Sequence, residues 1–426
     1  MLYHAFELHK ALLSPAVGLS TATSSLLLHA RSPLRDTWVG RTMAANHELF
    51  ARLHRRYPKP SFGIAAIGSA AERVSIREEV VADRPFCSLL RLRKESPVRA
   101  PKLLVVAPLS GHFATLLRDT VRTAVHDFEV YVTDWTDAKL VPLAQGAFHL
   151  DDYIDYVRDF LTFLGPDTQV LAVCQPTVPV LAAVSLLAQE DHPCTPRTLT
   201  LMAGPIDTRL HPTEVNRFAH SKPLSWFERN LIFGVPLPHP GFRRRVYPGF
   251  LQHLSFVAMN PDRHLKAHQE FYLDVVRGKH GKAQAHRDFY DEYNAVLDMA
   301  AEYYLDTIKV VFQESHLPRR IMRVRGQLVQ PEAIRRTALL TIEGAQDDVV
   351  GIGQTQAAHG LCRELPDSLR KHLLVEKVGH YGVFSGRRFR EQIYPAIRDF
   401  IGHHAGVPVP PLPTPRGDDL PAAHDQ

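Results

Sequence analysis

The chain has 426 residues, of which 45% are hydrophobic and 22% are charged, and its formal net charge is +5. This composition is typical of a globular protein, and it excludes a fully disordered chain or a fibre. The longest apolar run, residues 178–188, is about half as long as a spanning helix requires, so we expect no transmembrane segment. The mild positive charge comes without any nucleic-acid-binding motif, so no nucleic-acid partner is expected.

Four widely spaced cysteines, with no C-x-x-C pair among them, indicate neither a disulfide framework nor a zinc site; they are Cys87, Cys174, Cys194 and Cys362. His264 and His268 stand four residues apart but have no obvious third ligand, so no metal is expected. The N-terminus lacks a basic region, and Pro15 interrupts its apolar run, which argues against a signal peptide. These features predict free thiols in a reducing cytoplasm.

Residues 1–70 are predicted to form an N-terminal extension of helix and loop. Leu2, Phe6, Leu12 and Leu13 could share one helical face. That face would either pack on the main domain or touch a hydrophobic surface outside the molecule.

A series of short apolar runs follows, and helical patterns over 116–125, 151–164 and 177–188 separate them. Continuous hydrophobicity is typical of strands covered on both faces, and alternation of strand and helix indicates a parallel sheet. We therefore expect an α/β core over 71–204 and 338–401. The predicted strands are 74–81, 86–93, 103–108, 129–135, 170–174, 198–204, 338–344 and 373–378.

The alternation stops between residues 205 and 337, a segment that is mostly helical in pattern, for example over 287–312, and relatively rich in aromatic residues. It predicts a cap inserted before the strand 338–344. Trp226, Phe227 and the stretch 247–250 are candidates for an apolar surface around a site, or for the cap's own core. Residues 402–426 are rich in proline and predict a disordered tail.

The first chemically informative turn is Cys174-Gln175-Pro176, which follows the predicted strand 170–174 and opens the helix 177–188. A strand, a sharp turn and a helix form a nucleophile elbow, which needs small residues two positions before and after the nucleophile. Ala172 meets the first demand, and Pro176 is tolerated in the first turn of a helix. The turn predicts a thiol nucleophile at Cys174, whose reactive form is favoured by helix-terminus N–H groups and a paired imidazole.

Two further turns follow predicted strands and carry the partners that such a thiol needs. Asp347 and Asp348 follow the strand 338–344, and we prefer Asp347 because it should lie nearer the strand end. His380, flanked by glycines, follows the last strand. Nucleophile, acid and base in this chain order, each after its own strand, are the α/β-hydrolase arrangement.

An oxyanion site needs two backbone donors aimed at the developing negative charge. The N–H of Gln175, which follows the nucleophile, is one candidate. The second is the N–H of Leu109 or Ser110, in the loop after the strand 103–108, where Ser110 and Gly111 would let backbone approach a substrate. His112 would line the entrance or cap the next helix.

Several long segments of the sequence resemble intracellular polyhydroxyalkanoate (polyhydroxybutyrate) depolymerases, over roughly residues 1–401. They include VAPLSGHFATLLRDTVRT, VCQPTVPVLAAVSLLA, RRVYPGFLQHLSFVAMNPDRHL and GHYGVFSGRRFREQIYPAIRDFI. The family is related to polyhydroxyalkanoate synthases, which share an α/β-hydrolase core and a Cys-Asp-His triad. The resemblance places that triad on Cys174, Asp347 and His380.

The resemblance further implies a cytoplasmic enzyme that attacks amorphous storage granules and releases 3-hydroxybutyrate units or oligomers. No cofactor is expected, although coenzyme A is a possible acyl acceptor in place of water. A synthase-type acyltransferase with the same triad and a non-catalytic granule-binding protein remain alternatives. The sequence predicts no oligomeric state.

Overall fold

The computed structural model describes residues 2–68, 73–95 and 100–406. A nine-stranded sheet runs through its centre in the order β1-β2-β3-β5-β4-β6-β7-β13-β14. These strands are β1 (Ala66–Ile67), β2 (Val74–Arg84), β3 (Cys87–Lys94), β4 (Lys102–Val106), β5 (Glu129–Trp135), β6 (Gln169–Val173), β7 (Thr198–Met202), β13 (Ala338–Gly344) and β14 (Arg370–Val375).

The strands from β5 to β14 pair in parallel, whereas β1, β2 and β3 form an antiparallel edge that joins β5. Every residue of β6, β7 and β13 is buried, as continuous apolar runs predict for strands covered on both faces. The predicted α/β-hydrolase class is confirmed, with strand boundaries shifted by a few residues.

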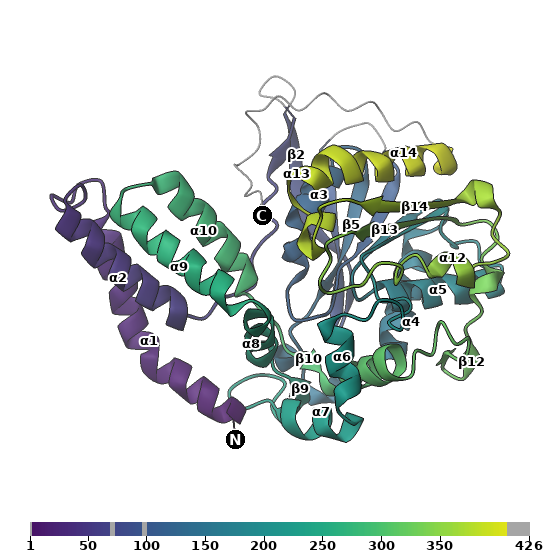
Figure 1. Ribbon diagram of the computed structural model, residues 1–426, viewed down its shortest axis with the longest axis horizontal. Coiled ribbons are helices and arrows are strands. Elements are labelled where there is room, and N and C mark those ends of the chain that lie inside the picture. The colour runs from purple at the N-terminus through teal and green to yellow at the C-terminus, as the bar shows by residue number, and fades with distance from the viewer. Residues whose placement is uncertain (1, 69–72, 96–99, 407–426) are drawn as a thin grey trace.

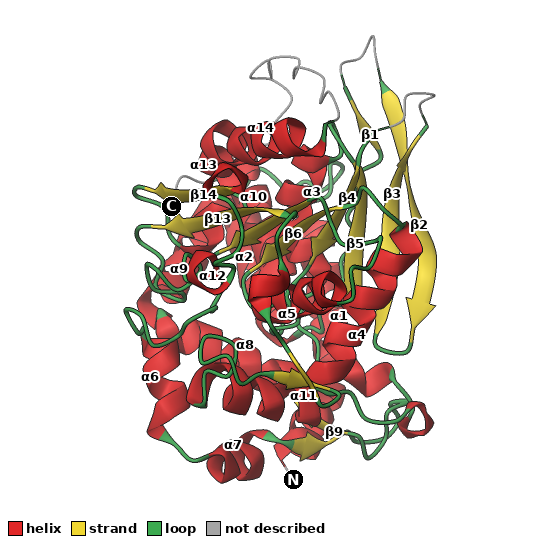
Figure 2. Cartoon of the chain, turned by 90° about the vertical axis from the view of Figure 1, so that its right-hand side faces the viewer, coloured by secondary structure: helices red, strands yellow, loops and turns green. Residues whose placement is uncertain are grey.

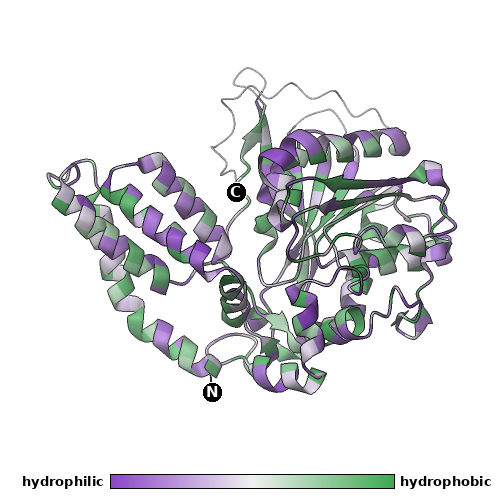
Figure 3. Cartoon of the chain, viewed as in Figure 1, coloured by the Kyte–Doolittle hydropathy of each residue, from purple (hydrophilic) through white to green (hydrophobic). Residues whose placement is uncertain are grey.

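Helices cover both faces of this sheet (Figures 1 and 2). α3 (Arg118–Ala124) and α14 (Tyr394–Ala405) lie on one face, and α4 (Leu150–Leu164), α5 (Thr177–Gln189) and α12 (Ala358–Leu361) on the other. The short α13 (Gly386–Arg388) precedes α14. Hydrophobic residues dominate the strands between the two layers (Figure 3). α14 continues to Ala405, so the predicted tail cannot start at residue 402, and residues 407–426 lie outside the described residues.

Between β7 and β13 the chain leaves the sheet and forms helices with two small strand groups. The helices are α6 (Glu214–Ser221), α7 (Leu224–Leu231), α8 (Gly249–Met259), α9 (Pro261–Val276), α10 (His280–Tyr293), α11 (Ala301–Asp306) and the π-helix η4 (Thr307–Gln313). The strands are β8 (Phe233–Gly234), β9 (Arg245–Tyr247) and β10 (Met299–Ala300), which form one sheet, and β11 (Arg323–Val324) and β12 (Gln327–Leu328), which form a hairpin.

The helix predicted over 287–312 is interrupted. Residues between α10 and α11 run extended, because the N–H of Leu297 donates to the carbonyl of Gly111 at 2.8 Å and Val296 forms a bridge with His112. Asp298 is buried there; it accepts hydrogen bonds from the Gly249 N–H at 2.8 Å and the Tyr3 hydroxyl at 2.5 Å. These tertiary hydrogen bonds outweigh the local helical preference of the segment.

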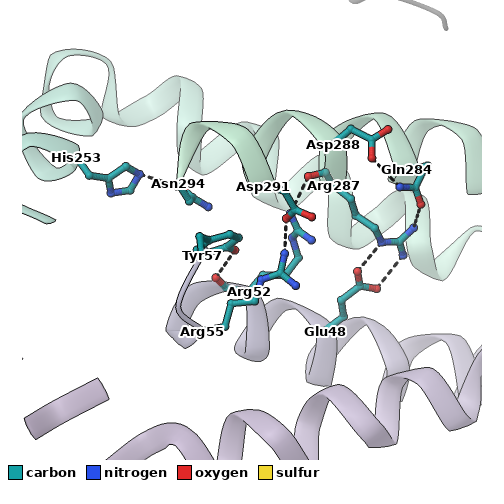
Figure 4. A network of polar contacts seen from close by, with 10 residues as sticks. All are labelled: Glu48, Arg52, Arg55, Tyr57, His253, Gln284, Arg287, Asp288, Asp291 and Asn294. Atoms are coloured by element: carbon teal, nitrogen blue, oxygen red, sulfur yellow. Dashed lines mark hydrogen bonds and ion pairs between the residues drawn. The ribbon is translucent and has the colours of Figure 1, made fainter. Parts of the chain in front are cut away.

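The N-terminal helices α1 (Leu2–Leu27) and α2 (Trp38–His54) do not pack on the sheet. Packing on the main domain was one of the two predictions for this segment. They join α9 and α10 in a four-helix lobe beside the core, which we call the helical lobe (Figure 1). Ion pairs between α2 and α10 connect segments far apart in the sequence (Figure 4). Arg52 donates to Asp291 at 2.7 Å, and Glu48 accepts from Arg287 at 2.6 Å. The strand β1, within the predicted extension, belongs instead to the sheet.

None of the helices in the described ranges is long and apolar enough to cross a membrane.

Candidate active site

Cys174 lies at the sharp turn between β6 and α5. Its φ of +67° falls in the left-handed region, which costs free energy for a residue other than glycine and is held only where the surroundings enforce it. Two hydrogen bonds enforce it here: the Cys174 N–H donates to the Met202 carbonyl at 2.8 Å, and the Thr177 N–H donates to the Cys174 carbonyl at 3.1 Å. The turn leaves the sulfur-bearing residue half-buried at the carboxyl edge of the sheet, where an elbow presents its nucleophile.

Asp347 lies in the turn after β13 and is fixed by three hydrogen bonds. Its Oδ1 accepts from the N–H groups of Val349 and Val350, both at 2.8 Å, and its Oδ2 lies 2.8 Å from Nδ1 of His380. The side chains of Asp347 and His380 are only 1% and 8% exposed, so solvent screens their attraction little. The neighbouring Asp348 is exposed, as the positional argument for Asp347 anticipated.

The loops after β13 and β14 are joined by backbone hydrogen bonds, from the Ala345 N–H to the Val375 carbonyl and from the Gln346 N–H to the Val378 carbonyl, each 2.9 Å. This pairing sets the distance between the carboxylate and the imidazole through main-chain geometry. His380 opens a 3-10 turn, His380–Val383, directly after its loop.

The charges around His380 favour its protonated form. Burial alone would lower the pKa of His380, but the charge of Asp347, the charge of the Cys174 sulfur and hydrogen bonds to both raise this pKa well above its usual value. The structure therefore brings all three residues predicted for the triad together. A protonated imidazole beside the sulfur can hold a negative charge there.

The predicted oxyanion residues are also adjacent, with a detail that the sequence did not indicate. The side-chain oxygen of Gln175 accepts from the Leu109 N–H at 3.4 Å, and its amide nitrogen donates to the hydroxyl of Tyr303. Among the described residues, nothing accepts a hydrogen bond from the backbone N–H of Gln175 or of Ser110. These two donors are thus free to donate to a ligand's oxygen, and Gln175 directly follows the half-buried Cys174.

Gly111 lies close to the insertion. Its φ is +110°, and a Cβ at this position would lie 2.7 Å from Oε1 of Gln252 and 3.3 Å from the ring of Phe256. Glycine is required here because α8 of the insertion packs against the loop after β4. The close approach that the structure shows is to α8, and the predicted approach to a substrate stays a prediction.

His112 does not line an entrance. It is 3% exposed, donates from Nε2 to the Tyr293 carbonyl at 3.1 Å, and lies between the rings of Phe256 and Tyr293. Burial lowers the pKa of His112 to about 4, although the Tyr293 carbonyl opposes this shift. The uncharged imidazole of His112 therefore links the core to the insertion.

Sequence reasoning missed Tyr303 and Tyr381. Tyr303 is buried, stacks on Tyr153 with ring centroids 5.5 Å apart, and contacts Gln175. Tyr381 follows His380 and is about one third exposed; burial, then Tyr293 and Cys174, raise its pKa. The surroundings of both tyrosines depend on how the insertion packs on the core, and no local sequence pattern indicates that packing.

The aromatic residues proposed for the mouth of the site lie elsewhere. Phe227 is fully buried within the insertion, Tyr247 is 7% exposed, and Phe250 stacks on Phe6. They pack cores, which was the other reading of the sequence. His264 hydrogen-bonds to Tyr290, and within the described part of the chain no group of three or more metal-ligating side chains occurs.

Residues 203–405 match the family described as PHB de-polymerase C-terminus. This range includes Asp347 and His380 and begins after Cys174. A search of curated proteins found no match.

Solved structures with a similar fold include three at low identity. The DcsB complex with its substrate analogue is 10% identical, covering 78% of this chain and 100% of that one, with a TM-score of 0.46. The alpha/beta hydrolase GrgF from Penicillium sp. sh18 is 12% identical, with 78% and 99% covered and a TM-score of 0.44. A monoacylglycerol lipase from Paleococcus ferrophilus is 11% identical, with 72% and 96% covered and a TM-score of 0.42.

The family match covers the insertion, the strands β13 and β14 and the loops that carry Asp347 and His380, and these two strands belong to a sheet of α/β-hydrolase topology. Over residues 203–405 the chain is therefore similar to the C-terminal part of PHB depolymerases, and its fold is that of the α/β hydrolases.

Proposed function

We propose that the protein cleaves the ester bonds of poly-3-hydroxybutyrate and similar short-chain polyhydroxyalkanoates in cytoplasmic storage granules. The products are 3-hydroxybutyrate units or oligomers. The observation that carries the proposal is the buried Asp347–His380 pair, 2.8 Å apart, beside a thiol at a strained strand-to-helix turn. The match of residues 203–405 to the family described as PHB de-polymerase C-terminus supports this substrate class.

In the first half of the reaction, His380 takes the proton of the Cys174 thiol, and the sulfur attacks the ester carbonyl carbon. The carbonyl oxygen becomes an oxyanion. His380 then gives its proton to the departing alkoxide oxygen as the C–O bond breaks, which leaves an acyl thioester on Cys174. Asp347 accepts from Nδ1 of His380 throughout and holds the ring with Nε2 toward the sulfur.

The oxyanion is stabilised by the N–H of Gln175 and the N–H of Ser110. Leu109 is the weaker candidate, because its N–H already donates to the side-chain oxygen of Gln175. The amide nitrogen of the same side chain donates to the Tyr303 hydroxyl, which fixes its orientation. Both open N–H groups lie in short loops at the carboxyl edge of the sheet, and preorganised donors of this kind lower the barrier by several kcal/mol, roughly 3 each.

In the second half, His380 takes a proton from water, the oxygen attacks the thioester, and the C–S bond breaks to release a carboxylic acid. The thiol of coenzyme A could replace water and release a CoA thioester, because a thioester intermediate is similar in energy to that product.

The test is incubation of the protein with amorphous poly-3-hydroxybutyrate particles, followed by mass spectrometry. We expect a hydroxyacyl adduct on Cys174, and free acid as product without coenzyme A. A CoA ester that forms only when coenzyme A is added would establish thiolysis. Product formation with the adduct on another residue would contradict the nucleophile, and net polymer synthesis from 3-hydroxybutyryl-CoA would reject the degradative direction.

A further inference from the structure

The outer face of α1 is apolar and exposed over most of the helix length. At about 100° per residue, seven positions from Leu8 to Leu26 fall within an arc of roughly 100°, and all seven are exposed and apolar. They are Leu8, Ala11, Leu12, Pro15, Leu19, Ala22 and Leu26. We call this set the α1 stripe.

The exposure of the α1 stripe is large and is not shared by the opposite face. Its four leucines are 61–71% exposed, whereas Tyr3, Ser20, Ser24 and Leu27 are buried against the rest of the molecule. The N-terminal helices α1 and α2 hold nine of the 25 large hydrophobic side chains that are exposed in the described residues, among them Trp38 at 71%. Contiguous exposed apolar surface of this kind marks an interaction site.

The α1 stripe carries no charge. Lys10 is the one Lys, Arg, Asp or Glu between Leu8 and Leu26, and its Nζ donates to the carbonyls of His54 and Arg55 at 2.9 and 3.3 Å, at the end of α2. The positions beside the stripe include Ala16 and Gly18. The surface that fits this face is therefore apolar and uncharged.

The lack of charge discriminates between three possible partners of the α1 stripe: anionic lipid, a second copy of the chain and a neutral polyester. Helices that lie on anionic lipid need Lys and Arg along their polar border, and α1 has none there. A coiled coil with a second copy needs three or more heptads and charged flanking positions to set its register, whereas the stripe spans fewer than three, contains Pro15 and is flanked by small residues. A neutral polyester requires no charge on its partner.

The helical lobe is joined to the site, although α1 itself lies at the outer edge of the molecule (Figures 1 and 3). α10 ends at Tyr293, whose ring packs on His112 in the loop after β4. Tyr293 is also among the groups that raise the pKa of Tyr381, the residue after His380. If the helical lobe were bound to a solid substrate, the active site would stay next to that substrate.

We propose that the α1 stripe is the surface by which the enzyme rests on solid, uncharged polyester. This inference rests on the proposed function, because a polymer that cannot diffuse into a buried site must be met by a docking surface on the enzyme.

The experiment measures cosedimentation with protein-free amorphous poly-3-hydroxybutyrate particles, in a Cys174→Ala background that stops turnover. Leu12→Gln combined with Leu19→Gln should weaken binding by about tenfold or more, because two exposed leucines are removed from the contact. The matched control, Ser14→Gln with Ser25→Gln, changes exposed residues of the same helix about 90° or more from the stripe centre and should bind as the parent does. With Cys174 intact, both pairs should hydrolyse a soluble 3-hydroxybutyrate oligomer at the parent rate.

Equal binding of both variants to the particles would overturn the proposal. Binding to phosphatidylglycerol vesicles that exceeds binding to the particles would assign the stripe to membranes, and a dimer that only the leucine pair abolishes, with particle binding intact, would assign it to a second copy. The proposed function fails separately, if the parent chain, with Cys174 and the stripe unaltered, does not cleave the soluble oligomer.

Discussion

The sheet and the helical lobe are organised by opposite means. In the sheet, apolar strands are buried on both faces, and the polar groups of the site are positioned by backbone hydrogen bonds at the strand ends. In the lobe, helices from two distant parts of the chain are held by side-chain ion pairs around a small apolar cluster, and their outer face is apolar and exposed. Main-chain geometry therefore positions the candidate catalytic residues, whereas side chains form the surface that meets the surroundings.

The sharpest way to test this division is Cys174→Ala. We expect kcat for ester hydrolysis to fall by about 10⁶-fold, because the nucleophile is lost while the oxyanion donors remain. The thermal unfolding midpoint should stay near that of the parent, since the turn is held by backbone groups. A variant that keeps its rate would place the nucleophile elsewhere.

Asp347→Asn and Asp348→Asn separate the two adjacent carboxylates. Loss of the charge at Asp347, which lies 2.8 Å from His380, should reduce kcat by roughly 10²- to 10⁴-fold and lower the pKa of His380, measurable by NMR titration of the imidazole. Asp348→Asn should leave both nearly unchanged, because its side chain is exposed. Equal effects of the two substitutions would contradict the assignment.

In the lobe, Asp291→Ala should affect stability without affecting chemistry. Arg52 is 5% exposed and would lose its carboxylate partner, at a cost of roughly 1–3 kcal/mol in the free energy of unfolding, because Asp291 itself is partly solvated. Asp288→Ala, an exposed neighbour on α10, is the control and should cost little. Urea denaturation measures the difference, and hydrolysis of a soluble ester should be unchanged in both.

His112 links the two regions and should make their junction sensitive to acid. Its pKa in the folded state is about 4, below the ordinary value of about 6.5, so its contribution to stability is complete above pH 6.5 and is lost as the pH falls toward 4. His112→Gln removes this titration. Between pH 6.5 and 4 the parent should lose up to about 3 kcal/mol relative to the variant, as measured by denaturation at each pH. Parallel stability curves would show that His112 is not responsible.

The sequence predicts the sheet and the triad well, because both follow from local patterns. An apolar run followed by a turn predicts a buried strand, and Cys174, Asp347 and His380 each stand at such a turn. Whether they act catalytically stays a prediction. Tyr303, the occupied Leu109 N–H and the role of Gly111 could not be predicted, because each depends on where the insertion packs.

The break in the helix predicted over 287–312 has the same origin. The pattern of that segment is helical, but Asp298 and Leu297 form hydrogen bonds with residues more than 45 positions away, and no periodicity in the segment encodes those partners. The lobe was missed for a related reason, since α1 and α2 carry no local sign that their partners are α9 and α10.

The pairing of Arg52 with Asp291 joins residues 239 positions apart, and this sets an order of events during synthesis. At translation speeds of about 5–20 residues per second, α1 and α2 leave the ribosome roughly 10–50 s before the helices that complete their lobe. Through that interval the face of α2 that later packs on α9 is uncovered in addition to the α1 stripe, so the nascent chain presents this apolar surface before its partner helices exist, and early capture by a chaperone would protect it until residue 293 has emerged.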